Sequence, residues 1–155
     1  MGEIKRTEKG IYYLEFLEGI KGIEERENLK EDNDCGVRAI ASATGATYSE
    51  AYEFAKNKLG REYNEGVEGW IKKMEALAGL KFLNGYKFKT MKQYSHRYTI
   101  SVEDFIKKHQ TGIYIVGITG HVFTIYNSVV IGNKEDSLNT FHMIGTAFQI
   151  YKSNE

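Results

Sequence analysis

Apolar side chains recur at helical spacing through three successive segments in the first half of the chain. The first segment opens at Cys35 and meets a glycine stop at Gly45. The second opens with the capping-box pattern of Thr47 to Glu50 and ends before Gly60. The third runs from about Gly66 to Ala78. The pattern therefore predicts a helical hairpin followed by a third helix.

Two segments precede these helices. The run Gly10–Glu18 is rich in aromatic residues and predicts an N-terminal strand. The stretch Ile20–Asp34 is charged and punctuated by glycines, which is typical of a loop. We expect this loop to lead directly into the helix that begins at Cys35.

Strand-like runs dominate the second half of the chain. An Asn84-Gly85 pair suits a tight turn, and Ser101 begins a short helix that ends near His109. Four β-branched or aromatic runs predict strands: Ile113–Ile118, His121–Tyr126, Val129–Ile131 and Ala147–Lys152. Helices thus precede a mainly antiparallel sheet, which predicts an α+β fold without βαβ alternation.

Length and charge narrow the class of protein. A chain of 155 residues favours a single domain over 1–155, and its 21 basic residues balance its 21 acidic ones. This balance gives no overall field that would recruit nucleic acid. No apolar run approaches the ~20 residues of a membrane-spanning helix. We expect a cytoplasmic protein with neither nucleic-acid nor membrane partners, and its oligomeric state stays open.

The chemistry of the chain centres on its only cysteine, Cys35. A single cysteine excludes an intramolecular disulfide and fits a reducing compartment. The polar residues before it form a loop that delivers the thiol to the first turn of a helix. Backbone N–H groups and the helix dipole favour the thiolate there, and the thiolate is the reactive form.

A histidine downstream supplies the partner that such a thiol needs. His121 follows Gly120 at the mouth of a predicted strand. A free thiol has a pKa of about 8.5 and is mostly protonated at neutral pH, whereas a neighbouring imidazole can accept its proton. Cys35 and His121 are therefore candidate catalytic residues.

These two motifs carry a resemblance to a known family. Asp34-Cys35-Gly36-Val37-Arg38, followed by Gly120-His121-Val122, resembles compact papain-like cysteine proteases, including leader-peptide-cutting peptidases and short relatives common in bacteriophage genomes. SUMO-type proteases also use an Asp-Cys-Gly cysteine, but their histidine lies upstream, whereas all four histidines here lie downstream. The resemblance implies N-terminal helices, the nucleophile helix first, packed on a mainly antiparallel sheet. It also implies a hydrolase of amide or isopeptide bonds in a protein or peptide.

In that family an Asn or Asp on the next strand orients the histidine, and strand register decides between two candidates. A two-residue turn at Asn127-Ser128 leaves Asp136 on the face of His121. A three-residue loop or a bulge brings Asn133 there instead. We favour Asn133, with Asp136 as the alternative.

The family also uses a side-chain amide, commonly a Gln about six positions before the nucleophile, to stabilise the oxyanion. Position 29 is leucine, so Asn33, in the loop that presents the thiol, is the better candidate. Asp34 could bind substrate or cap the helix, and capping is the favoured interpretation.

The remaining polar residues suggest no second chemistry. His96, His109 and His142 are interpreted as surface, capping or structural residues, and Trp70 as a core residue. One cysteine and scattered histidines give no metal-ligand spacing, and no phosphate-binding glycine pattern occurs, so we expect no metal and no cofactor.

Two functional classes follow. The first is a Cys–His enzyme, hydrolytic by default, although acyl transfer and deamidation use the same thiolate. The second is a catalytically silent papain-like binding module, for example an inhibitor of a host factor. Reactivity of the thiol discriminates between the two classes.

Overall fold

The computed structural model describes residues 3–66, 68–77 and 82–152, and within these ranges seven strands form one mixed sheet. The strands lie in the order β1-β2-β6-β5-β4-β7-β3. All neighbours pair antiparallel except β2 and β6, which run parallel. The strands are β1 (Lys5–Arg6), β2 (Tyr12–Glu15), β3 (Tyr86–Thr90), β4 (Ile113–Ile118), β5 (His121–Tyr126), β6 (Val129–Gly132) and β7 (Thr146–Lys152).

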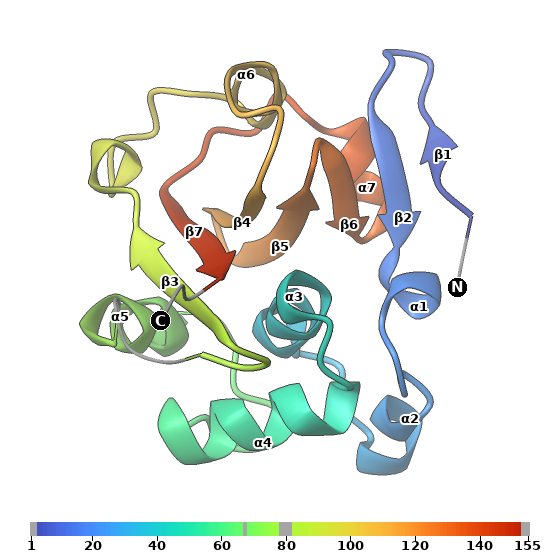
Figure 1. Ribbon diagram of the computed structural model, residues 1–155, viewed down its shortest axis with the longest axis vertical. Helices are drawn as coiled ribbons and strands as arrows, with labels where there is room; N and C mark the ends of the chain where they lie inside the picture. The colour runs from blue at the N-terminus through green and yellow to red at the C-terminus, as the bar shows by residue number, and fades with distance from the viewer. Residues whose placement is uncertain (1–2, 67, 78–81, 153–155) are drawn as a thin grey trace.

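Helices surround this sheet, and α3 lies at the centre of the molecule, packed against β5 on one side and α4 on the other (Figure 1). The helices are α1 (Phe16–Gly19), α2 (Glu25–Leu29), α3 (Cys35–Thr44), α4 (Tyr48–Lys58), α5 (Glu68–Ala76), the 3₁₀ turn η1 (Lys92–Tyr94), α6 (Val102–Lys108) and α7 (Lys134–Leu138). No helix among the described residues has both the length and the apolar character required to cross a membrane.

Burial, a C-terminal glycine and hydrogen bonds to β5 together fix the position of α3. All 10 residues of α3 are buried, as expected for a helix packed on every side. Gly45 ends it in the left-handed conformation at φ 74°, which glycine adopts without strain. On the sheet side, the Thr124 hydroxyl of β5 donates to the Ala39 carbonyl at 2.8 Å and accepts from Ser42 at 3.0 Å. These bonds fix α3 against the strand that begins with His121.

The sheet is apolar on both faces. Ile115 belongs to a buried cluster formed with α3, α4 and α5, whereas its neighbour Val116 belongs to a second cluster formed with α6. Successive residues of a strand point to opposite faces, so the two clusters lie on either side of the sheet. Helix α3, which begins with Cys35, lies on the first side.

Most predicted elements are confirmed. The capping box at Thr47 and Glu50 begins α4, and β4 and β5 have the predicted bounds. Helix α5 falls within the predicted range, although Val67 and Ala78 lie outside the described residues. At Asn84-Gly85 both residues have positive φ, as a tight turn requires.

Four expectations were incomplete or wrong. The predicted strand Gly10–Glu18 turns into helix α1 after Glu15, and the predicted loop Ile20–Asp34 contains helix α2. The chain after β6 forms helix α7, which the sequence did not predict. The N-terminal strand β2 pairs parallel to β6, so part of the sheet precedes the helices in the chain.

Candidate active site

Cys35 is the first residue of α3, and its side chain is 9% exposed. Burial raises the pKa of the thiol, but a hydrogen bond with His121, a second from the Val122 backbone N–H and the charges of His121 and Arg38 outweigh it. The pKa of Cys35 therefore lies below its ordinary value. The thiolate is stabilised by specific contacts in a site that is otherwise poorly hydrated.

His121 reaches the thiol from the start of β5. It pairs with Ile118 across a two-residue turn in which Gly120 has φ 72°, a conformation that suits glycine. Its Nε2 donates to Asp136 Oδ2 at 2.9 Å, which leaves Nδ1 as the ring nitrogen available to Cys35. Burial lowers the pKa of His121, but hydrogen bonds with Asp136 and Cys35 raise it to about 9. These opposite shifts favour a thiolate–imidazolium pair.

The residue that contacts the histidine is Asp136, and the preference for Asn133 was wrong. Asn133 Oδ1 accepts from Arg38 at 2.9 Å, while its backbone N–H donates to Asp136 Oδ2 at 2.8 Å. Asp136 thus accepts from both His121 and the N-cap of α7, and its side chain is only 6% exposed. The capping bond and the histidine bond hold the same carboxylate oxygen in place.

The strand register explains this outcome. Tyr126 pairs with Val129 across a two-residue turn, and both Asn127 and Ser128 have positive φ. The three-residue alternative is therefore wrong. The strand then ends at Gly132, and Asp136 arrives from the first turn of α7 rather than from an extended strand. A Cβ on Gly132 would lie 2.5 Å from Asp136 Oδ2, so the absent side chain makes room for the carboxylate.

Asn33 is exposed, and its amide is used in a contact between two loops. Its Nδ2 donates to the carbonyl of Asn64 at 3.1 Å, and its own carbonyl accepts from Arg61 at 3.3 Å. Arg61 is in turn paired with buried Glu31 at 2.7 Å. These bonds hold the loop that precedes Cys35, and one of the two N–H groups of the Asn33 amide is used in them.

Asp34 does not cap α3 through its side chain, contrary to the sequence interpretation. Its fully buried carboxylate accepts from Arg26 Nε at 2.7 Å, from Arg38 Nε at 3.1 Å and from the Tyr48 hydroxyl at 2.6 Å. Burial raises the pKa of Asp34, but these partners outweigh it and the pKa is lowered. A charged carboxylate, neutralised by two guanidinium groups, therefore immediately precedes Cys35.

Sequence reasoning missed the residues that support this network. Arg38 lies four positions after Asp34 on one helix face, so the i,i+4 spacing could have identified it. Phe16 lies under both guanidinium groups, with the Arg38 Cζ 4.1 Å and the Arg26 Cζ 5.2 Å from its ring centroid. No sequence signal indicates Phe16 or Arg26, because both belong to segments whose helices were not predicted.

The other histidines lie outside this site. His109 Nε2 bonds the Tyr94 hydroxyl at 2.7 Å, and burial lowers its pKa. His142 is exposed. Within the described ranges, no three His, Cys, Asp or Glu side chains gather as they would around a metal ion.

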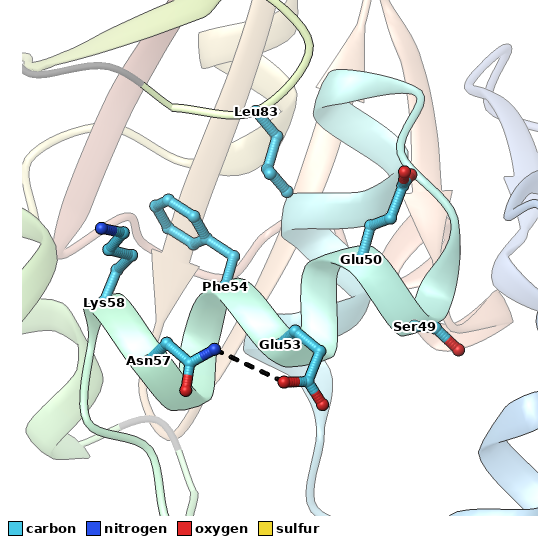
Figure 2. A pocket seen from close by; sticks show the side chains of 7 residues that line it. All are labelled: Ser49, Glu50, Glu53, Phe54, Asn57, Lys58 and Leu83. Carbon is cyan, nitrogen blue, oxygen red and sulfur yellow. Dashed lines mark hydrogen bonds between the residues drawn. The ribbon is translucent and has the colours of Figure 1, made fainter.

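A hollow lies beside α4. Figure 2 shows Phe54 and Leu83 bordering it, and Glu53 hydrogen-bonded to Asn57 at 3.4 Å. The described residues that line it include no cysteine and no histidine. Its lining combines Phe54 and Leu83 with charged and polar side chains of α4.

Comparisons of the chain with models of known families, with curated proteins and with solved structures found no match.

Proposed function

We propose that this chain is a cysteine hydrolase that cleaves an amide, peptide or isopeptide bond through a thioester on Cys35, and that its arrangement is papain-like. The observation that carries the proposal is the chain of contacts from Cys35 through His121 to Asp136. The pKa of the thiol is lowered and that of the imidazole is raised to about 9. Such paired shifts are typical of nucleophile and base in thiol catalysis.

In the first half of the proposed reaction, the Cys35 thiolate attacks the substrate carbonyl carbon. A C–S bond forms and the carbonyl π pair moves to oxygen. As that pair returns, the C–N bond breaks and the imidazolium of His121 gives its proton to the leaving amine. Asp136 accepts a hydrogen bond from the Nε2–H throughout, so Nδ1 is the nitrogen that exchanges protons. The product of this half is an acyl thioester on Cys35.

In the second half, neutral His121 takes a proton from water, whose oxygen attacks the thioester carbon. The C–S bond breaks, the carboxylic acid is released, and Cys35 leaves as the thiolate beside the imidazolium that holds the proton taken from water, which restores the starting pair. An amine entering in place of water would make the same site an acyltransferase. Hydrolysis is the default because water needs no binding site of its own.

The test is alkylation of Cys35 by iodoacetamide, followed by intact mass spectrometry over a range of pH. The wild-type chain should add one label with an apparent pKa below the ordinary thiol value of about 8.5. His121→Ala should raise that apparent pKa, because it removes both the hydrogen bond and the positive charge. The apparent pKa, and not the absolute rate, is the readout, since removing a ring also opens access to a buried thiol.

Two variants serve as controls. Cys35→Ala should take up no label, and His142→Ala, which removes an exposed histidine, should titrate like wild type. If Cys35 titrates like a free peptide thiol in both wild type and His121→Ala, the imidazole does not activate it. The catalytically silent binding module would then be the better account.

A further inference from the structure

Asp136, the residue that contacts His121, lies on a helix too short to fix its own position. Helix α7 has 5 residues, and a helix of this length depends on tertiary contacts for its stability. Its first turn must be held from outside if Asp136 Oδ2 is to stay 2.9 Å from His121 Nε2. The contacts of Asn133, the N-cap residue of α7, therefore bear on the geometry of the site.

Asn133 makes two hydrogen bonds with different reach. Its backbone N–H donates to Asp136 Oδ2 at 2.8 Å, the same oxygen that His121 contacts. Its side-chain Oδ1 accepts from Arg38 Nη1 at 2.9 Å, across 95 positions of the chain. The first bond stays within the turn, whereas the second joins the turn to α3, the helix that begins with Cys35.

The guanidinium group of Arg38 is held before it reaches Asn133. Arg38 is 9% exposed, and its Nε donates to Asp34 Oδ1 at 3.1 Å. Its Cζ lies 4.1 Å from the ring centroid of Phe16. Because the guanidinium is planar, an Arg38 with one donor bound and one face covered presents Nη1 in a defined direction. Asn133 is thus bound to a fixed point of α3.

We propose that Arg38 and Asn133 form a positioning pair, which sets the location of Asp136 and, through it, of His121 relative to Cys35. This inference rests on the proposed hydrolase function. Arg38 acts through Asn133, and Asn133 acts through Asp136, so neither member of the pair exchanges a proton with the thiol. Proton transfer between Cys35 and His121 needs close contact, and a misplacement of about 1 Å can cost about 10²-fold in rate.

The first experiment follows the pKa of His121 by NMR titration in Asn133→Ala, Arg38→Lys and the double variant. The alanine removes the acceptor Oδ1 without changing any charge, and the lysine keeps the charge but donates from one compact group. Burial lowers the pKa of His121, and the hydrogen bond with Asp136 is the strongest effect that raises it. Each single variant should therefore lower the midpoint from about 9. The double variant should lower it no further, because both substitutions break the same bond.

Arg26→Lys is the matched control for the lysine substitution. Arg26 Nε donates to the same Asp34 carboxylate at 2.7 Å, and its Cζ lies 5.2 Å from the same Phe16 ring centroid. Within the described residues its side chain hydrogen-bonds to Asp34 alone. The His121 midpoint in this variant should match wild type.

Three results of this titration would overturn the inference. The first is an unchanged midpoint in Asn133→Ala, a half-buried position whose truncation leaves the core intact. The second is an equal fall in Arg26→Lys, which would assign the shift to the surroundings of Asp34 as a whole. The third is an additive fall in the double variant, which would mean that Arg38 and Asn133 act by separate routes.

The second experiment tests whether Asn133 acts through His121, with iodoacetamide alkylation of Cys35 as the readout. Burial raises the pKa of the thiol, and the hydrogen bond with His121 is the strongest effect that lowers it. A displaced imidazole should stabilise the thiolate less, so the apparent pKa of Cys35 should rise in Asn133→Ala. Asn133→Ala combined with His121→Ala should titrate like His121→Ala alone, because no imidazole remains to be positioned.

A further rise in that combined variant overturns the inference and leaves the hydrolase proposal intact. A wild-type thiol that titrates like a free peptide thiol overturns the proposed function instead. In that case the His121 midpoints still decide whether Arg38 and Asn133 position the imidazole, so the two failures are distinguishable.

Discussion

Replacing Asp136 with asparagine tests the electrostatic basis of the site most directly. The Asp136 carboxylate accepts a hydrogen bond from His121 Nε2 at 2.9 Å, and asparagine keeps an oxygen that can still accept from the Asn133 N–H. The substitution therefore removes the negative charge while retaining the cap of α7. The expected result is a large fall in the pKa of His121.

The magnitude follows from the contacts. The pKa of His121 is raised from 6.5 to about 9 against the opposing effect of burial, with Asp136 the larger favourable cause and Cys35 the second. Each pKa unit corresponds to about 1.4 kcal/mol, so the whole shift is worth roughly 3 kcal/mol. Losing the larger share should lower the pKa by about 1–2 units, toward the ordinary value.

The assay is an NMR titration of the four histidine ring signals, with His121→Ala used to assign the relevant one. The His121 midpoint should move from about 9 in wild type to a distinctly lower pH in Asp136→Asn. Glu135→Gln is the matched control, because Glu135 is an exposed acid in the same helical turn. An unchanged midpoint in Asp136→Asn, or an equal fall in Glu135→Gln, would refute the reasoning.

The same shift has a signature in stability. The folded-state pKa of His121 lies above its unfolded value of 6.5. Its stabilising contribution is therefore fully present below about pH 6.5 and is lost as pH rises through about 9. The unfolding free energy of wild type, measured in urea, should fall over this pH range. In Asp136→Asn the fall should be smaller and should occur at lower pH.

Two further substitutions test the packing around the site. Gly132→Ala places a Cβ against the Asp136 carboxylate, so it should lower the His121 midpoint in the same NMR titration without removing any charge; an unchanged midpoint would contradict the close approach. Asp34→Asn strands two guanidinium groups and should lower the unfolding free energy by about 3–5 kcal/mol in urea, whereas Asp32→Asn, at an exposed neighbour, should change it little. Equal unfolding free energies of Asp34→Asn and Asp32→Asn would refute this expectation. Because the pKa of Asp34 is lowered, its stabilising contribution is present above pH 3.8 and is lost as pH falls through the folded-state pKa.

The sequence predicts those parts of the fold that local rules decide. The capping box at Thr47, the glycine stop at Gly45 and the tight turn at Asn84-Gly85 each set a boundary through short-range geometry. The positions of Cys35 and His121 follow, because each lies at the first residue of an element with clear periodicity.

The features that the sequence did not predict depend on contacts between residues far apart in the chain. Helix α7 has only 5 residues, too few to show an apolar period, so Asp136 looked like a strand residue. Asn133 ends the strand segment and caps this helix, and its side chain is drawn to Arg38, 95 positions away. The parallel pairing of β2 with β6 is likewise long-range, and no local pattern encodes it.

The negative charge of Asp34 lies next to Cys35, where it acts against formation of the thiolate. A carboxylate immediately before the nucleophile would by itself raise the pKa of the thiol. Here two arginines neutralise it, and the charge of one of them, Arg38, also lowers the pKa of Cys35.

Arg38 also connects the two halves of the site. Its Nε donates to Asp34, the residue before Cys35, and its terminal NH1 donates to Asn133, whose backbone N–H donates to the carboxylate of Asp136. A single guanidinium therefore joins the helix that carries the thiol to the turn that orients the histidine. A lysine has one compact ammonium group and cannot bind both partners with this fork geometry. A lysine at position 38 would therefore leave either Asp34 or Asn133 without its bond, and the helix and the turn would no longer be joined.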